Sequence, residues 1–216
     1  MPWMQHFQSA NWNQVSWIAL GAYALGCFTT GYYLVKLRTG QDIRDVGSGT
    51  VGARNVGRLL GWPGFWLTVA GDFAKGAFAV WAVKYFRKDD SLLILSMIAV
   101  VAGHVWPVQL FFRGGKGVAT SLGALLLYDY HLAGAFALVF AIAFAFLRRT
   151  VLPGLFAFAC LPLVCMWEEH NNPRTIGISM LAALVLLAHR KNLVEEFSLL
   201  IERSHARQEQ RHRAKR

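Results

Sequence analysis

The chain has 216 residues, of which 55% are hydrophobic and only 16% are charged. Its 22 Lys and Arg residues outnumber its 12 Asp and Glu residues, and the charges gather between long apolar runs. This composition excludes a disordered chain and an ordinary soluble domain, because soluble domains are about 45–50% apolar and spread their charges over a surface. The pattern is typical of a polytopic membrane protein, and the length leaves no room for a second globular domain.

Seven apolar runs are candidate transmembrane helices, because about 20 helical residues are needed to cross the hydrocarbon core. They are residues 15–37, 62–86, 91–112, 118–128, 132–147, 151–167 and 175–188. The fourth run is too short to span comfortably, and only three residues separate it from the fifth. One long broken helix is therefore an alternative for these two runs.

Basic residues predict how the spans are oriented. With seven spans and an external N-terminus, the inside segments hold 17 Lys and Arg residues and the outside segments hold 4. The positive-inside rule therefore favours an all-α membrane bundle of about seven transmembrane helices, with the N-terminus outside and the C-terminus inside. The first 13 residues carry no Lys or Arg, unlike the start of a cleaved signal peptide, so we expect the N-terminus to be that of the mature protein.

The first inside loop reads QDIRDVGSGTVGARNVGRLLG and is rich in glycine. Its glycines leave backbone N–H groups accessible to a ligand, and Ser48, Asn55 and Arg58 add polar side chains. This combination can bind a phosphate. Gly47 and Gly49 also begin a G-x-G-x-x-G pattern, but no strand precedes it, which argues against a dinucleotide site. A flexible basic connector is the alternative.

The second span contains GDFAKGAF, in which Asp72 and Lys75 lie three residues apart on one helix face. There they can neutralise each other, and ionisable residues inside a span are functional candidates by default. A structural pair that fixes helix packing is an equal alternative. His104 lies in the third span, where a hydrogen-bonded structural histidine is favoured over a catalytic one. We expect these three residues to support the site from behind.

The third span ends in AGHVWPVQLFFRGGKGVATSLG, in which Pro107 bends or breaks the helix before a glycine-rich turn. Gly114, Gly115 and Gly117 flank Lys116 in this turn. The sequence therefore places a cation on a backbone that a phosphate can approach closely. A plain tight turn is the alternative.

The last span runs into LLAHRKNLVEEF, which places His189 and Asn192 three residues apart on one helix face. The alternative is that His189 is only a polar residue at the membrane boundary, without a functional role. The predicted topology brings this pair and both glycine-rich loops to the inside face, and their convergence favours a functional site.

Basic residues dominate the tail after Phe197. A solvated helix is the favoured structure for it, and the alternative is an apolar stripe of Val194, Phe197, Leu200 and Ile201 on an anionic lipid surface. Nucleic-acid binding would need a folded reader or an aromatic platform, and neither is visible. The three cysteines lie in apolar runs without metal-ligand spacing, so we expect buried thiols and no metal site.

Four blocks together resemble the bacterial acylphosphate-dependent glycerol-3-phosphate acyltransferases, an integral membrane family of the seven-helix type. The blocks are GCFTTGYYLVKL, RDVGSGTVGARNVGR, GHVWPVQLFFRGGKGVATSLG and LLAHRKN, with DFAKG as a further match. The resemblance covers most of the chain, from about Gly21 to Asn192. It implies acyl transfer from acyl phosphate to the 1-hydroxyl of glycerol 3-phosphate, giving lysophosphatidic acid and inorganic phosphate in phospholipid synthesis.

The resemblance also implies roles for individual residues. The implied catalytic residues are Ser48, Arg58, Lys116, His189 and Asn192. The implied substrate-binding residues are Gly47, Gly49, Asn55, Gly114, Gly115, Gly117 and Thr120, and the implied supporting residues are Asp72, Lys75 and His104. Arg58 and Lys116 would grip phosphates, Ser48 would hold the donor phosphate, and the last pair would orient glycerol phosphate. The acyl chain is expected between helices, toward lipid.

An acyl phosphate is already activated, so the implied reaction needs no cofactor and no metal. Lys and Arg side chains would neutralise two anionic substrates and preorganise the attacking hydroxyl. The resemblance implies a phosphate oxygen of the substrates as the proton acceptor, and His189 is the alternative from the protein. No histidine begins an H-x-x-x-x-D motif, so the other large class of acyltransferase mechanism is not expected.

Four features depart from the family pattern. Thr50 stands where Asn is usual, Arg54 where Thr or Ser is common, and Gly57 where a larger apolar residue is frequent. RRTVLPGLF replaces the third motif, with Thr150 as a nearby substitute for its polar contact. The alternative to the enzyme is thus a membrane paralogue that transports or holds a lipid precursor. A transporter should show internal symmetry and broken helices at the midplane, whereas the polar groups here gather at one face.

We therefore expect an extracytoplasmic segment at 1–14, a membrane acyltransferase domain at 15–192 and a basic cytoplasmic tail at 193–216. The expected location is the cytoplasmic (inner) membrane of a bacterium, with several passes. The expected partners are acyl phosphate, glycerol 3-phosphate and membrane lipids, and not nucleic acid. The basic tail is a candidate docking segment for a soluble enzyme that produces acyl phosphate.

Overall fold

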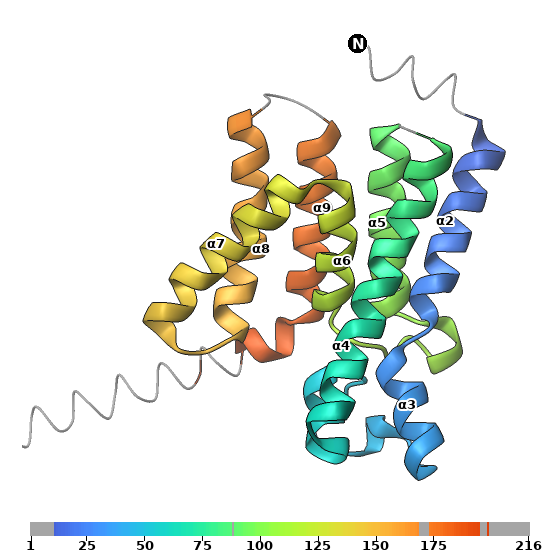
Figure 1. Cartoon of the computed structure of the whole chain (residues 1–216), viewed down its shortest axis with the longest axis vertical. Coiled ribbons are helices and arrows are strands. Elements are labelled where there is room, and N and C mark those ends of the chain that lie inside the picture. Colours follow the sequence, from blue (N-terminus) through green and yellow to red (C-terminus); the bar gives the residue numbers. More distant parts are fainter. Residues whose placement is uncertain (1–10, 88, 169–172, 195–197, 199–216) are drawn as a thin grey trace, which may run out of the picture.

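The computed structural model describes residues 11–87, 89–168, 173–194 and 198, and helices are the regular elements of these ranges (Figure 1). The prediction of an all-α fold is confirmed. The α-helices are α2 (Trp12–Cys27), α3 (Thr30–Thr39), α4 (Ala53–Phe86), α5 (Asp90–Val105), α6 (Val118–Tyr128), α7 (Tyr130–Leu147), α8 (Val151–Glu168) and α9 (Pro173–Ala188). Short 3-10 helices, η1 (Ile43–Asp45) and η2 (Val108–Leu110), lie in the α3–α4 and α5–α6 loops. The segment 1–14 and the tail from 193 lie mostly outside the described residues, as do Phe197, Leu200 and Ile201 of the predicted stripe.

Each of the seven apolar runs lies largely on helix, although the first is interrupted between Cys27 and Thr30 and the third extends past the end of α5, and Asp129 separates the fourth from the fifth. Its Oδ1 accepts hydrogen bonds from the backbone N–H groups of His131 at 2.7 Å and Leu132 at 3.4 Å. An aspartate that caps N–H groups in this way starts a new helix. In Figure 1, α6 runs along the bundle and α7 turns back across it. The alternative of one long broken helix for these two runs is therefore wrong.

Successive loops lie at opposite ends of the bundle. In Figure 1 the α3–α4, α5–α6 and α7–α8 loops and the end of α9 lie at the lower end, whereas α2 begins at the upper end. Helical stretches long and apolar enough to cross a membrane are Trp12–Thr39, Asp90–Leu110 and Tyr130–Leu147, and shorter apolar helices are Val118–Tyr128, Val151–Trp167 and Pro173–Ala188. The number of crossings and the orientation stay predictions.

Glycines bring two pairs of helices into close contact. Gly26 and Gly103 lie where α2 crosses α5, and Gly76 and Gly123 lie where α4 crosses α6. A Cβ atom on any of them would lie 2.0 or 2.1 Å from a backbone carbonyl oxygen of the facing helix. Small residues allow such backbone approach between membrane helices, where van der Waals packing drives association. These contacts fix the two helix pairs on which the loops at the lower end are mounted.

Helix α4 bends near its start, and the bend separates its first two turns from the apolar part. Gly61 has φ 70° and ψ −168°, which is not a helical conformation and is one that glycine adopts most easily. Pro63 follows in the first turn of the helical part after the bend, where proline is tolerated. Trp62 and Trp66 are exposed beside the bend, as is common for Trp at a membrane interface. The first piece of α4 therefore belongs to the lower end of the bundle. It packs there on a small separate core of Val35, Ile43, Val51, Val56 and Leu110.

Candidate active site

One buried amide holds together the α3–α4 loop, called the first loop below; the α5–α6 loop is called the second loop. Asn55 is only 1% exposed, and its Nδ2 donates to the carbonyl oxygens of Ile43, Val46 and Thr50 at 2.8 to 3.1 Å. Its Oδ1 accepts a hydrogen bond from the N–H of Ser48 at 3.0 Å. Because both ends of the amide are used by the backbone, Asn55 shapes the loop from inside and is a supporting residue in this structure.

Glycine lets the backbone turn beside this amide. Gly47 has φ 60°, and a Cβ atom on it would lie 2.3 Å from Oδ1 of Asn55. Gly49 also has a positive φ, of 67°. Ser48 lies between them, is exposed, and places its Oγ 3.1 Å from Oγ1 of Thr50. The loop thus presents a serine hydroxyl and glycine backbone at its surface.

Two arginines lie one helical turn apart at the start of α4. Arg54 and Arg58 are both exposed, whereas Val56 between them is fully buried in the small core. Their guanidinium groups therefore extend from the face of α4 that is turned away from this core. The sequence assigned a role to Arg58 but none to Arg54.

A third arginine ties the first loop to the second. Arg44 pairs with Asp42 at 2.5 Å, and its Nη1 donates to the carbonyl oxygen of Leu110 in η2 at 2.8 Å. Hydrogen bonding from Arg44 holds the pKa of Asp42 below its ordinary value. The contact joins residues 66 positions apart, and no local sequence signal indicates it.

Backbone hydrogen bonds set the second loop against the end of α5. The N–H of Gly114 donates to the carbonyl oxygen of Val105 at 3.1 Å, and that of Gly115 donates to the carbonyl oxygen of His104 at 3.0 Å. Gly117 then takes φ 81° directly before α6 begins. The loop is therefore a defined structure and not only a flexible connection.

Lys116, between the glycines of this loop, reaches the short segment that follows α9. It is half-buried, and its Nζ donates to Oδ1 of Asn192, a residue 76 positions later in the chain. Two of the predicted catalytic residues are thus in direct contact. Figure 1 shows the start of α6 and the end of α9 at the same end of the bundle.

His189 follows α9 directly and is 6% exposed. Its Nδ1 lies 2.8 Å from the carbonyl oxygen of Val185, which can only accept, so Nδ1 carries the proton and Nε2 is left as an acceptor. Burial lowers the pKa of His189 below its ordinary value, and the charges of Lys116 and Arg54 also lower it, although the bond to Val185 acts in the opposite direction. The imidazole is therefore neutral at pH 7.

The structure brings most of the predicted site residues to one end of the bundle. Arg44 joins the first loop to the second, Lys116 joins the second loop to the segment after α9, and the charge of Arg54 acts on His189. Exposed or half-buried cations, glycine backbone and a neutral histidine are therefore gathered in one region. Such a region suits ligands with more than one negative charge.

Of the predicted substrate-binding residues, Thr120 does not join this region. It is fully buried on α6, at the point where Gly76 of α4 crosses. Its hydroxyl oxygen has no hydrogen-bond partner among the described residues. The structure thus places Thr120 in the helix contact and not on a surface that a substrate reaches.

Asp72, Lys75 and His104 form a buried cluster above the loops. Lys75 Nζ lies 3.0 Å from Oδ1 of Asp72 and 2.8 Å from Nδ1 of His104. The predicted contact between the two charged residues on one helix face is confirmed. The three side chains are at most 5% exposed, so they contact the rest of the protein and not bulk solvent.

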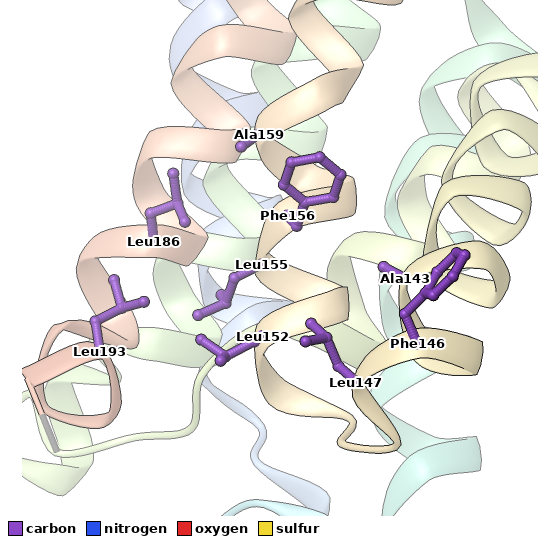
Figure 2. A pocket seen from close by; sticks show the side chains of 9 residues that line it. All are labelled: Ala143, Phe146, Leu147, Leu152, Leu155, Phe156, Ala159, Leu186 and Leu193. Atoms are coloured by element: carbon purple, nitrogen blue, oxygen red, sulfur yellow. The ribbon is translucent and has the colours of Figure 1, made fainter. Parts of the chain in front are cut away.

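An apolar groove runs along α7, α8 and the end of α9 (Figure 2). Its volume is about 500 Å³, and it is lined by Ala143, Phe146, Leu147, Leu152, Leu155, Phe156, Ala159, Leu186 and Leu193. Leu193 directly follows Asn192 in the chain, so this end of the groove lies beside the polar region. Ala159 lies at the opposite end in Figure 2.

The structure accounts for one departure from the family pattern and locates the others. A Cβ atom on Gly57 would lie 3.0 Å from Cβ of Phe65, because the bend in α4 folds these residues together, so a large side chain has no room there. Thr50 contacts Ser48 in the first loop. Thr150 is exposed in the α7–α8 loop, at the same end of the bundle.

Comparison with known proteins gives a consistent result. A family model described as glycerol-3-phosphate acyltransferase matches residues 16–198. The chain is 48% identical over 176 residues to glycerol-3-phosphate acyltransferase 1 of Desulfitobacterium hafniense, covering 82% of this chain and 87% of that protein. It is 39% identical over 181 residues to glycerol-3-phosphate acyltransferase of Clostridioides difficile, covering 82% of this chain and 88% of that protein.

Solved structures show the same likeness in three dimensions. The chain resembles PlsY (YgiH), an integral membrane glycerol 3-phosphate acyltransferase, in its glycerol 3-phosphate form, with a TM-score of 0.77 and 34% identity. The lysophosphatidic acid form of PlsY matches with a TM-score of 0.75 and 32% identity. Each match covers 86% of this chain and 92% of the solved chain.

Proposed function

Because the chain belongs to the glycerol-3-phosphate acyltransferase family, we propose that it transfers an acyl group from an acyl phosphate to the 1-hydroxyl of glycerol 3-phosphate. The chain is an integral membrane enzyme that acylates glycerol 3-phosphate. The products are lysophosphatidic acid and inorganic phosphate. The acyl phosphate donor and the residue roles that follow are part of the proposal.

This assignment rests on the cations that lie around glycine-rich loops at one end of the bundle. The donor and the acceptor each bring a phosphate, and two anions repel each other unless positive groups lie between them. Arg58 extends from the exposed face of α4, and Lys116 lies half-buried in the second loop. We assign these two cations to the phosphates, which they neutralise while holding the reactants together. Arg54 adds a third positive charge to the region.

The first loop suits the phosphate of the donor. Ser48 presents its hydroxyl between two glycines, and the loop is fixed from below by the Asn55 amide. A hydroxyl and free backbone N–H groups stabilise an anion without a large side chain in the way. As the carbon–oxygen bond to phosphate breaks, charge develops on the leaving oxygen, and donors aimed at that oxygen lower the barrier.

The segment directly after α9 suits the acceptor, glycerol 3-phosphate. Asn192 is held by Lys116, and His189 offers Nε2 as an acceptor while Nδ1 is fixed on the backbone. In the reaction the 1-hydroxyl oxygen attacks the acyl carbon, and the electron pair of the broken bond leaves with phosphate. The hydroxyl proton passes to a phosphate oxygen of the substrates, and neutral His189 is the alternative acceptor from the protein.

The acyl chain needs an apolar path that begins at the polar region. The groove along α7, α8 and the end of α9 begins at Leu193, next to Asn192, and carries only apolar side chains. We place the acyl chain in this groove, with Ala159 toward its far end (Figure 2). Burying the chain there keeps the reactive carbonyl at the boundary between lipid and water.

We assign this end of the bundle to the cytoplasmic side of the bacterial inner membrane, because its loops are basic and the positive-inside rule favours that side. Both phosphorylated substrates are then reached from the cytoplasm. A soluble enzyme that makes acyl phosphate is the expected supplier, and the basic tail is the segment assigned to it.

Lysophosphatidate formation by the purified protein in detergent tests the assignment. The substrates are an acyl phosphate and labelled glycerol 3-phosphate, and the variants are Lys116→Ala, Arg58→Ala and His189→Ala. We expect product from the wild type and a loss in each variant. Lys84→Ala, a cation at the opposite end, is the matched control and should keep its activity. A folded wild type without product would overturn the proposed reaction.

A further inference from the structure

Helix α2 ends at Cys27 and α3 begins at Thr30, inside what reads as one apolar run. The two residues between them are extended, so carbonyl groups near the end of α2 lose their helical partners. Within a membrane such groups need partners from the protein. Side chains from α4 and from the second loop supply them, and Gln109 Nε2 donates to the carbonyl oxygen of Cys27 at 2.5 Å.

Lys75 and Asp72 bind the two sides of this break. Lys75 Nζ donates to the carbonyl oxygens of Gly26 at 3.0 Å and Phe28 at 2.8 Å. Oδ1 of Asp72 accepts from the N–H of Thr30, the first residue of α3, at 3.3 Å. The cation thus lies at the C-terminal end of one helix and the carboxylate at the N-terminal end of the next, as both helix dipoles favour.

The same lysine sets the orientation of His104. Carbonyl oxygens only accept, so Lys75 donates an N–H to each of these two carbonyl groups. Lys75 Nζ also lies 2.8 Å from Nδ1 of His104, and this hydrogen bond ties the ring to the lysine. Lys75, which also binds the helix break, therefore fixes the position of the His104 ring from that side.

The opposite edge of this ring lies against the second loop. A Cβ atom on Gly115 would lie 2.1 Å from Nε2 of His104, so the ring fills the space above that residue. The N–H of Gly115 also donates to the carbonyl oxygen of His104 at 3.0 Å. Lys116 is the next residue in the chain, and it reaches Asn192.

We propose that the buried cluster of Asp72, Lys75 and His104 positions Lys116 for the reaction. Burying ionisable groups inside a membrane bundle is costly, and helix packing alone is achieved by apolar side chains. The cluster instead connects the helix break to the backbone that precedes Lys116. His104 acts through this backbone and is a positioning residue. The proposal rests on the proposed function for the role of Lys116.

Two single variants and their combination test the contact between ring and loop. His104→Asn keeps a polar amide near the position of Nδ1 but removes the ring edge that supports the loop. Gly115→Ala drives a methyl group into that edge. Each should lower kcat/KM for glycerol 3-phosphate by about 100-fold, since a displacement of about 1 Å costs that much at a reacting centre.

The double variant should lose no more of its kcat/KM than either single variant, because the shorter Asn side chain leaves room for the added methyl group. Losses that multiply in the double variant would overturn the proposal. Gly134→Ala is the matched control, because a Cβ atom there meets nothing within 4 Å. Its kinetics should equal those of the wild type, and its melting temperature should match those of the test variants within a few degrees.

The reactivity of Lys116 toward an amine-modifying reagent, followed by mass spectrometry, gives a readout that does not depend on activity. We expect a several-fold change in its modification rate in His104→Asn and in Gly115→Ala, with no change in Gly134→Ala. An unchanged rate in both test variants would overturn the positioning role, even if the wild type is active. A changed rate together with an inactive wild type would leave the positioning role standing and contradict the proposed function alone.

Discussion

Replacing Asn55 by Asp tests how the first loop is held, because the change swaps an NH₂ group for an oxygen of similar size. In the wild type that group donates to three backbone carbonyl oxygens at 2.8 to 3.1 Å, in a residue only 1% exposed. In Asn55→Asp an oxygen faces the same three oxygens. The NH₂ group has two hydrogens shared among these three contacts, so at about 1 kcal/mol net for each hydrogen bond the loop loses about 2 kcal/mol, and an unpaired buried charge adds to this cost. Asn55→Ala loses these bonds without adding a charge, so we expect the Asp variant to be the more damaged of the two.

Hydrogen exchange by mass spectrometry over residues 43–55, beside lysophosphatidate formation, measures the effect. A loss of about 2 kcal/mol corresponds to roughly 30-fold faster exchange of the loop amides. Activity should fall with it while the helices keep their protection. Asn13→Asp, at an exposed site in α2, is the matched control. Wild-type exchange and activity in Asn55→Asp would show that this amide does not hold the loop.

Three further predictions concern charge, packing and the acyl groove. Arg54→Gln should raise the pKa of His189, followed by NMR of labelled histidine, because one of the charges that lower it is removed; an unchanged pKa would contradict their proximity. Since the folded-state pKa is the lower one, this histidine destabilises the fold as the pH falls below about 6.5, and the variant should lessen that loss. Gly57→Leu should lower the melting temperature by forcing Phe65 aside, and adding Phe65→Ala should restore part of it; no rescue would argue against their contact. Ala159→Trp should lower the rate with long acyl phosphates more than with short ones, and equal losses would place the chain elsewhere.

Much of the fold could be predicted from the sequence, because apolar runs between charges mark helices in a membrane protein. The run 118–128 coincides with α6, since a glycine with positive φ precedes it and Asp129 ends it. The break after Cys27 could not be predicted, because neither Pro nor Gly lies between α2 and α3. Partners from distant parts of the chain stabilise that break, and only the folded structure brings them there.

The candidate site was predictable as a set of polar residues but not as a set of contacts. Lys116 and Asn192 could be named from their surroundings, yet the hydrogen bond between them joins two ends of helices that only tertiary packing brings together. Arg54 carries no local signal of its effect on His189. Thr120 belongs to the same motif as Lys116, but its position on α6 directs it toward the contact with α4 and away from the site.

Donor selectivity with product stoichiometry tests the central claim most directly. Purified wild type is given labelled glycerol 3-phosphate with either an acyl phosphate or an acyl-CoA of the same chain length, and lysophosphatidate and inorganic phosphate are measured together. We predict one phosphate released for each lysophosphatidate formed from acyl phosphate, and no product from acyl-CoA. Product from acyl-CoA alone, or lysophosphatidate without matching phosphate release, would contradict the assignment of the cationic end of the bundle to a phosphate leaving group.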